Sequence, residues 1–169
     1  SGRIQAGTMK HLQNIPLKNY CTYRIGGTAR DIYFPASPEE LVDIVRHHRA
    51  QSLPYWIHGG GANTLFPDNE ILLPIISTSE MTATRFDGDT VFAEAGKVMD
   101  AWVLECLRDG LGGVECLSGI PGTLGGALFM NAGAYGHEIS DQLHSVTILT
   151  RDSRVIELPK AECGFGYRK

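Results

Sequence analysis

The chain has 169 residues, of which 43% are hydrophobic and 20% are charged, and its formal net charge is -4 at pH 7. This length fits one domain or two small sub-domains, and the composition is that of an ordinary globular protein. The slightly acidic balance argues against general nucleic-acid binding, and no apolar run is long enough for a membrane span. We therefore expect a cytoplasmic protein without nucleic-acid, membrane or obligate protein partners.

The cysteines, Cys21, Cys106, Cys116 and Cys163, are widely spaced and form no CxxC pair. A chain that can build an apolar core does not need disulfides, so we interpret them as free thiols of a reducing compartment. The histidines lack metal-ligand spacing, and no metal site is predicted. No signal-peptide pattern is visible, and residues 1–9 are interpreted as a cloning remnant outside the fold.

Residues 10–76 are predicted to form a small α/β sub-domain. After an irregular lead-in, residues 30–35 are a strand candidate that ends at its proline, and short apolar strands follow at 54–58 and 71–76. With a helix between the first two strands, this is a strand–helix–strand unit. It indicates a small parallel sheet.

The helix of this unit has a clear expected start. Ser37 is the predicted N-cap, Pro38 occupies the first turn, and Glu40 comes three residues after the cap. Apolar residues at helical spacing follow, and basic residues lie near the end of the segment.

Residues 77–169 are predicted to form a second sub-domain with a mainly antiparallel sheet and one or two helices. Residues 82–86 and 90–95 resemble a hairpin joined by an Asp-Gly turn, and 145–150 and 155–158 are two further strands. The overall expectation is an α+β fold.

One helix of this second part is expected to be capped by Asp100 and to stop at Gly110. The segment between residues 112 and 136 is rich in glycine. Clustered glycine indicates backbone that turns tightly or lies close to another group.

The first glycine-rich loop, His58–Thr64, comes directly after a predicted strand. Its consecutive glycines could expose N–H groups in a concave nest for phosphate oxygens, and Asn63 adds a donor. Glycine nests are common, so a plain flexible turn remains open. The loop lacks the Lys-Ser/Thr ending of a P-loop and the helix and later acidic residue of a Rossmann fingerprint.

The second glycine-rich loop runs from Ser118 to Ala127 and is followed by a small-residue stretch at 131–136. Thr123 could cap a short helix, whose N–H groups would favour a pyrophosphate or the electron-rich edge of a flat ligand lying on its bare side. Close helix–strand packing also requires small residues and is the alternative. Two such loops in one short chain favour a large phosphate-bearing cofactor.

Four segments also match a known family in order and spacing: residues 22–27, 59–63, 117–136 and 164–168. On these segments the chain resembles the UDP-N-acetylenolpyruvoylglucosamine reductase (MurB) family of the peptidoglycan pathway. The resemblance covers nearly all of the chain after about residue 12. It implies an FAD-binding fold of the PCMH/vanillyl-alcohol-oxidase type, with FAD held non-covalently.

In that family NADPH reduces the flavin, which then reduces the enolpyruvyl group of UDP-N-acetylglucosamine enolpyruvate to give UDP-N-acetylmuramate. The reaction serves peptidoglycan synthesis and thereby cell-wall biogenesis, cell shape and cell division. The cofactor-binding residues that the resemblance implies are Gly59, Gly60, Gly61, Ala62, Asn63, Thr64, Gly119, Ile120, Pro121, Gly122, Thr123, Gly125, Gly126, Ala127, Asn131, Gly133 and Ala134.

The same resemblance implies that Arg168 is catalytic and that Tyr167 contacts the substrate. Hydride addition to an enolpyruvyl group builds negative charge next to a carboxylate, which a fixed guanidinium can stabilise and hold. Without the motif, an exposed arginine near the end of the chain would be the ordinary interpretation.

In the family a serine normally comes two residues after this arginine, and a substrate domain with a catalytic serine and glutamate follows. Neither lies within these 169 residues. We therefore expect the cofactor-binding half, unable to complete turnover alone. Two alternatives stay open: a flavin-binding module without reductase activity, and an oxidase of the same fold superfamily.

Overall fold

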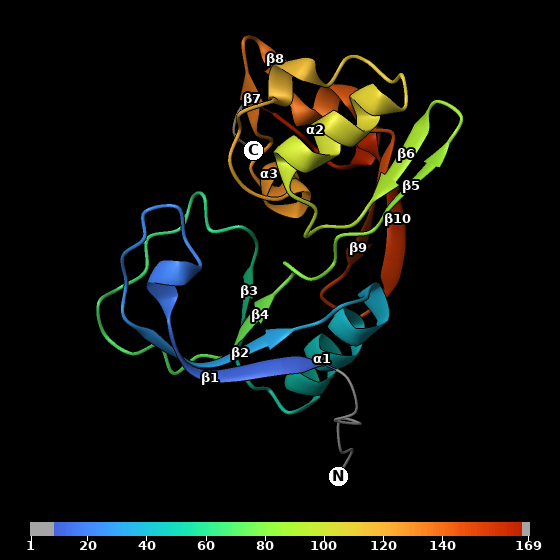
Figure 1. The fold of residues 1–169 in the computed structure, drawn as a ribbon. Coiled ribbons are helices and arrows are strands. Elements are labelled where there is room, and N and C mark those ends of the chain that lie inside the picture. The colour runs from blue at the N-terminus through green and yellow to red at the C-terminus, as the bar shows by residue number, and fades with distance from the viewer. Residues whose placement is uncertain (1–8, 167–169) are drawn as a thin grey trace. The chain divides into compact units, whose positions relative to one another are not determined.

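The computed structural model describes residues 9–166, which fold as two compact units divided between Thr82 and Ala83 (Figure 1). The sequence-based boundary lies at residue 76. The first unit combines parallel and antiparallel strands with one long helix, and the second holds antiparallel strands and two helices. The predicted α+β class is confirmed.

In the first unit, residues 9–82, a four-stranded sheet has the order β1-β2-β4-β3. The strands are β1 (Lys10–Pro16), β2 (Thr28–Phe34), β3 (Trp56–His58) and β4 (Ile75–Ser77). β1 pairs antiparallel with β2, whereas β4 lies parallel to both β2 and β3. The predicted parallel sheet is therefore present, with one antiparallel strand added at its edge.

Helix α1 (Pro38–Ala50) connects β2 to β3 (Figure 1). Ser37 lies in extended backbone, and its hydroxyl accepts a hydrogen bond from the N–H of Glu40 at 3.3 Å. The carboxylate of Glu40 in turn accepts from the N–H of Ala36 at 2.8 Å. The predicted cap is confirmed. The helix is buried at Ile44, Val45 and His48.

Two strands are shorter than predicted. β3 begins at Trp56, and Ile71 forms only an isolated bridge with Ala29 before β4. The reason is that Pro54 and Pro74 have no N–H to donate to a neighbouring strand. Pro74 takes part through its carbonyl alone, which accepts from the N–H of Trp56 at 2.9 Å.

The core of the first unit extends beyond the sheet into the segment that follows β1. Leu17 and Cys21 are buried in the same apolar cluster as the sheet residues. The backbone around residues 17–21 is therefore held against the sheet, which matters for the loop that it contacts. The cluster consists of Leu17, Cys21, Ala29, Ile32, Phe34, Phe66 and Ile75.

Among residues 83–166 the strands form three two-stranded antiparallel sheets rather than the single sheet expected. Segments containing α2 (Met99–Arg108) and α3 (Leu124–Phe129) separate the first pair from the second. The sheets are β5 (Thr84–Asp87) with β6 (Thr90–Ala93), β7 (Gly133–Ala134) with β8 (His137–Glu138), and β9 (Ser145–Leu149) with β10 (Val155–Pro159).

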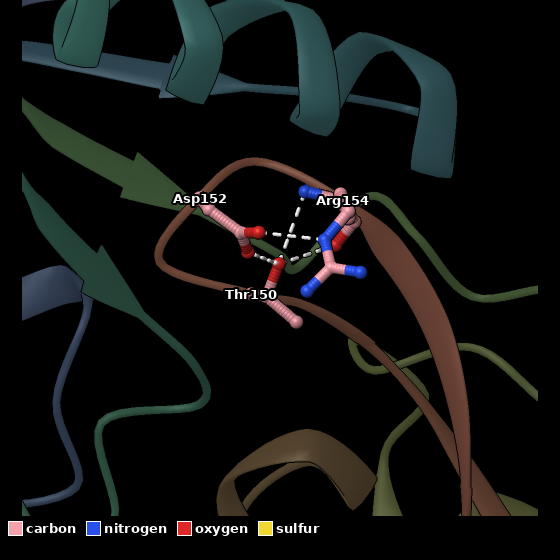
Figure 2. Close-up of polar contacts among 3 residues, drawn as sticks. All are labelled: Thr150, Asp152 and Arg154. Atoms are coloured by element: carbon pink, nitrogen blue, oxygen red, sulfur yellow. Dashed lines mark hydrogen bonds and ion pairs between the residues drawn. The ribbon is translucent and has the colours of Figure 1, made fainter.

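The predicted Asp-Gly turn is present, and a second turn joins β9 to β10. Gly88, at φ 58°, lies in the turn between β5 and β6. Figure 2 shows the turn between β9 and β10, where the Asp152 carboxylate accepts from the Thr150 hydroxyl and from Nε of Arg154 at 2.5 and 2.6 Å. Ser153, at φ 64°, reverses the chain. The ion pair between Asp152 and Arg154 is exposed, so it contributes little to stability.

The second unit has its own apolar core between α2 and α3. α2 ends at Arg108, and Gly110 follows it at φ 83°, as predicted for a helix stop. Four short 3-10 helices also lie within the described residues: Leu17–Asn19 in the first unit, and Glu115–Leu117, Ile139–Gln142 and Lys160–Glu162 in the second. The core residues are Met99, Val103, Cys106, Val114, Leu117, Leu124, Ala127 and Ile139.

Replacing Ser37 with Ala should lower the free energy of unfolding by about 1 kcal/mol, because one N–H of the first helical turn loses its acceptor. Urea unfolding of the two proteins measures this difference. Ser37→Asp is the matched control, since its carboxylate can accept the same hydrogen bond and should retain the stability. Equal stability of Ser37→Ala and the parent protein would contradict the role of this cap.

Candidate functional site

The first glycine-rich loop follows β3 and is fixed through His58. Only 4% of His58 is exposed, and its Nε2 donates to the carbonyl of Tyr20 at 2.9 Å. The carbonyl of His58 accepts from the N–H of Thr78 at 2.9 Å. Burial lowers the pKa of the imidazole, an effect that the Tyr20 carbonyl partly offsets. The neutral ring therefore has a structural role at the base of the loop.

Gly61 lies against the segment that carries Tyr20. A Cβ on Gly61 would lie 2.1 Å from the Tyr20 carbonyl oxygen and 2.8 Å from Cα of Cys21. Its backbone is left-handed, with φ 68°, and its carbonyl accepts from the N–H of Thr22 at 3.1 Å. Glycine is required here by packing within the unit, and the loop is not the freely flexible turn of the alternative interpretation.

The rest of the predicted pyrophosphate loop faces outward. Gly60 and Asn63 are exposed, and Gly59, Ala62 and Thr64 are half-buried. These positions are therefore at least partly accessible, whereas His58 and Gly61 of the same loop are buried. This arrangement suits a loop that binds a ligand without first having to become ordered.

The segment before β2 supports this loop, a structural role that was not predicted from the sequence. Gly26 (φ 125°) and Gly27 have no room for a Cβ: one would meet Phe66, and the other the carbonyl oxygens of Asp68 and Asn69. The N–H of Gly27 donates to the carbonyl of Pro67 at 2.7 Å. The adjacent glycines were the available signal, but their partners lie about forty residues away in sequence.

The depressed pKa of His58 predicts a pH dependence with a defined sign. The unfolded chain takes up a proton near the ordinary pKa of 6.5, whereas the folded protein resists protonation. Stability should therefore be intact above that value and decrease as the pH falls below it. In His58→Gln, whose amide can still donate to Tyr20, this part of the pH dependence should be absent.

Denaturant unfolding of the first unit, followed through Trp56 fluorescence in a Trp102→Phe background, would measure this effect between about pH 7.5 and about pH 5.5. The parent protein should lose more stability over this range than His58→Gln does. Parallel pH profiles for the two proteins would show that His58 is not buried in its neutral form.

The second glycine-rich loop is fixed by its close contact with the segment before α2. The N–H groups of Leu124 and Gly125 donate to the carbonyls of Lys97 and Ala95, both at 2.8 Å. A Cβ on Gly125 would lie 2.7 Å from Cβ of Ala95. At Gly125 the small residue serves close backbone packing, which is the alternative that the sequence left open.

These contacts correct the expected role of the α3 N terminus. Two of its first N–H groups already have carbonyl partners and are not available to a pyrophosphate. Thr123 stands at the N-cap position, but its hydroxyl makes no capping hydrogen bond. The helix start is satisfied by backbone from another segment instead, so no side-chain cap is required.

Asp100 was expected to cap α2, and this was wrong. The helix begins at Met99 after an N-cap at Val98, and Oδ1 of Asp100 accepts from the N–H of Gly119 at 2.6 Å. Gly119 has left-handed backbone, with φ 80°. The N–H of Met99 donates to the carbonyl of Gly122 at 3.1 Å. The start of α2 therefore holds the loop at two points.

Two buried oxygen atoms near this loop have no hydrogen-bond partner within residues 9–166. They are Oγ1 of Thr123 and Oδ1 of Asn131, in side chains that are 4% and 2% exposed. Buried polar atoms are nearly always paired, and leaving one unpaired costs about 1–3 kcal/mol. Both residues were predicted from sequence to bind the cofactor.

Gly126 differs from Gly125 in having an open side. It is exposed, and the nearest atom to an added Cβ would be Oγ1 of Thr123 at 3.5 Å, an ordinary contact. Ile120, Gly122 and Ala127 are half-buried or buried beside it, whereas Pro121 is exposed. A bare backbone face and an unpaired hydroxyl therefore lie next to each other.

The stretch after α3 forms a hairpin through β7 and β8. Asn131 has left-handed backbone at φ 43°, and a Cβ on Gly133 would meet the carbonyl oxygen of His137 at 2.2 Å. Ala134 is half-buried in β7, and Tyr135 at the tip is 90% exposed with φ 55°. Tyr167 and Arg168, predicted to contact the substrate and to be catalytic, lie outside the described residues.

The described residues also bear on metal binding, membrane spanning and disulfides. Among residues 9–166, no group of three or more His, Cys, Asp or Glu side chains is arranged to hold a metal ion. Within the same residues no helix has the length and apolar character needed to cross a membrane. Cys21, Cys106, Cys116 and Cys163 are free thiols, the first two buried and the others half-buried.

Residues 30–159 match the family model described as an FAD binding domain. The chain belongs to the FAD-binding domain family. The two loops and the orphaned oxygens lie within the matched region. The predicted cofactor class therefore agrees with the family, and the residues present fit it: Thr123 and Asn131 offer unpaired polar atoms, and Gly126 offers a bare surface.

Relatives with similar sequences are UDP-N-acetylenolpyruvoylglucosamine reductases. That of Caldicellulosiruptor bescii is 36% identical over 95% of this chain and 51% of its own length. That of Lactobacillus delbrueckii subsp. bulgaricus is 38% identical over 92% of this chain and 52% of its own length. The resemblance predicted from the motifs is confirmed, and the chain spans about half the length of these curated relatives.

The comparison with solved structures agrees with these sequence relatives. The reductase (MurB) from Thermus caldophilus has a TM-score of 0.76 and 33% identity, covering 96% of this chain and 56% of that one. Aclacinomycin oxidoreductase, at 17% identity and a TM-score of 0.64, covers 90% of this chain and 34% of that one. The second likeness shows the fold alone. The chain is thus a MurB-like FAD-binding domain of the predicted vanillyl-alcohol-oxidase type.

Proposed function

We propose that this chain is the FAD-binding half of an NADPH-dependent UDP-N-acetylenolpyruvoylglucosamine reductase. The observation that carries the proposal is its 36% identity to such a reductase over 95% of the chain. That span includes both glycine-rich loops. The product would be UDP-N-acetylmuramate, and the setting would be peptidoglycan synthesis in the cytoplasm.

We assign the pyrophosphate of FAD to the loop of the first unit and the flavin to the loop of the second. Support for the first assignment comes from the outward-facing backbone at Gly59 and Gly60, which rests on the packed Gly61. Support for the second comes from the open face of Gly126 and the unpaired Thr123 hydroxyl. The remaining residues that we propose for the FAD site, through contact or by shaping the loops, are Ala62, Asn63, Thr64, Gly119, Ile120, Pro121, Gly122, Gly125, Ala127, Asn131, Gly133 and Ala134.

The role of the glycines differs within this set. Gly61, Gly125 and Gly133 are required by packing inside their own units, so their contribution to FAD is to shape the loop. Gly119 has nothing within 4 Å of an added Cβ, and Gly126 has only an ordinary contact. At Gly119 and Gly126 the absence of a side chain would therefore serve a ligand directly.

When bound, FAD supplies a centre that accepts hydride from NADPH and returns it to a double bond. Arg168 would hold the carboxylate of the enolpyruvyl group with paired N–H donors and stabilise the negative charge that develops beside it. Tyr167 would contact the same substrate. The half-length match to the relatives supports the further proposal that this chain binds FAD but does not complete turnover by itself.

Two other functions are less well supported. A flavin-binding module without reductase activity would share the FAD site and differ only in what the rest of the protein does. An oxidase of the same superfamily has the fold in its favour, since solvent-stable cholesterol oxidase has a TM-score of 0.63. Its identity is only 18%, whereas the Thermus caldophilus reductase reaches 33%. This difference favours the reductase.

The Thr123 hydroxyl provides a specific test of FAD binding. Thr123→Val removes an oxygen that has no partner in the unit, so the fold should be at least as stable as before. If that oxygen bonds FAD, the affinity should fall about tenfold, which corresponds to one hydrogen bond. Titration of FAD by quenching of its fluorescence gives both dissociation constants.

The matched control is Thr147→Val, an identical change at an exposed position of β9. It should leave FAD affinity unchanged. Failure of the parent chain to bind FAD would refute the proposed function itself. Binding that is equally tight in the parent and in Thr123→Val would refute only the assigned contact.

A further inference from the structure

The turn at residues 21–25 is fixed against the first glycine-rich loop. The N–H of Thr22 donates to the carbonyl of Gly61 at 3.1 Å, and a Cβ on Gly61 would lie 2.8 Å from Cα of Cys21. The N–H of Arg24 donates to the carbonyl of Cys21 at 3.2 Å, which closes the turn. We call residues 21–25 the Arg24 turn. Its backbone and that of the loop therefore hold each other in place.

The middle of the Arg24 turn is exposed, although its base is buried. The buried thiol of Cys21 donates to the carbonyl of Ile25 at 3.3 Å. Arg24 itself is exposed and has left-handed backbone at φ 54°, and the flanking Tyr23 is 58% exposed. Glycine or asparagine adopts this backbone at lower cost than arginine does. The turn therefore presents a cationic side chain to solvent from a fixed backbone.

The two segments that meet here carry positive charge and no carboxylate. Residues 17–27 contain Lys18 and Arg24 but neither Asp nor Glu, and residues 56–66 contain no Asp, Glu, Lys or Arg. His58, in the second segment, is buried, and burial lowers its pKa. Within residues 9–166 the Arg24 guanidinium forms no ion pair with any carboxylate. Its charge is therefore available to an anion from outside the protein.

Arg24 lies close to the accessible backbone of the loop. Two trans peptide bonds separate Cα of Thr22 from Cα of Arg24, so these atoms are at most about 7.6 Å apart. Thr22 is itself hydrogen-bonded to Gly61, the neighbour of the exposed Gly60. An extended arginine side chain spans a distance of this order. The guanidinium can therefore reach an anion that is bound on the backbone at Gly59 and Gly60.

We propose that Arg24 binds the pyrophosphate of FAD from beside the loop. This inference rests on the proposed function, which assigns the pyrophosphate to the loop at His58–Thr64. The N–H groups of a glycine-rich loop supply only partial charges, whereas a pyrophosphate carries full negative charges. A guanidinium adds a full positive charge and paired N–H donors, which match two phosphate oxygens. Arg24 thus supplies the cation that the loop itself lacks.

Arg24→Gln tests the proposal, because it removes the charge and keeps a long, unbranched side chain. Its stability in urea should equal that of the parent, since the side chain is exposed. Its affinity for FAD, measured by fluorescence quenching, should fall about tenfold or more, as expected for a lost hydrogen-bonded charge pair. Arg30→Gln is the matched control: this guanidinium lies on β2, 3.9 Å from Glu70. It should leave the affinity within about twofold.

The salt dependence of binding shows whether the contact is one between charges. Raising KCl from about 0.05 M to about 0.5 M should weaken FAD binding more in the parent than in Arg24→Gln, because salt screens the interaction of opposite charges. Equal affinities or parallel salt dependences of these two proteins would overturn the proposal, as would an equal loss of affinity in Arg30→Gln. Failure of the parent to bind FAD would instead refute the proposed function, and the role of Arg24 with it.

Discussion

The close approach of Gly125 to Ala95 is the constraint on which the second unit depends. A Cβ on Gly125 would lie only 2.7 Å from Cβ of Ala95, so no residue larger than glycine fits at this position. The close approach also lets two N–H groups at the start of α3 donate to the carbonyls of Ala95 and Lys97. A salt bridge at 2.5 Å between Lys97 and Glu105 of α2 keeps that segment in place, and the hydrogen bond from Lys97 lowers the pKa of the Glu105 carboxyl. The loop before α3 is thus held in place by the segment at residues 95–97 and by α2.

The first unit applies the same physical principle at Gly61. There the loop after β3 rests on the Tyr20 carbonyl, which also accepts from the buried His58. In both units glycine provides rigidity through close packing rather than freedom to move. A loop that is ordered before the ligand arrives loses little conformational entropy on binding, which favours retention of a large cofactor such as FAD.

Features encoded by neighbouring residues could be predicted from the sequence. The Ser37 cap, the turn at Gly88 and the helix stop at Gly110 each depend on a few adjacent positions, and all are present. Features that depend on distant partners could not. Asp100 has the sequence pattern of a helix cap, yet its partner is the N–H of Gly119. The carbonyls that accept from the first N–H groups of α3 belong to residues 95 and 97, and the sequence around α3 does not indicate them.

The candidate site shows the same limit. The glycine-rich motifs predicted the cofactor class of the family that the chain matches. They did not distinguish Gly125, which packs against its own unit, from Gly126, which faces outward. Nor did they show that Asn131 is engaged with Gly166, a contact that spans 35 residues.

The central claim is that this chain binds FAD without covalent attachment. The most direct test is the visible absorbance spectrum of the purified chain after incubation with FAD and desalting. We expect flavin bands that stay with the protein and are released, as intact FAD, when the protein is denatured. A desalted protein without flavin bands, even after incubation with a large excess of FAD and with its fold verified by circular dichroism, would contradict it.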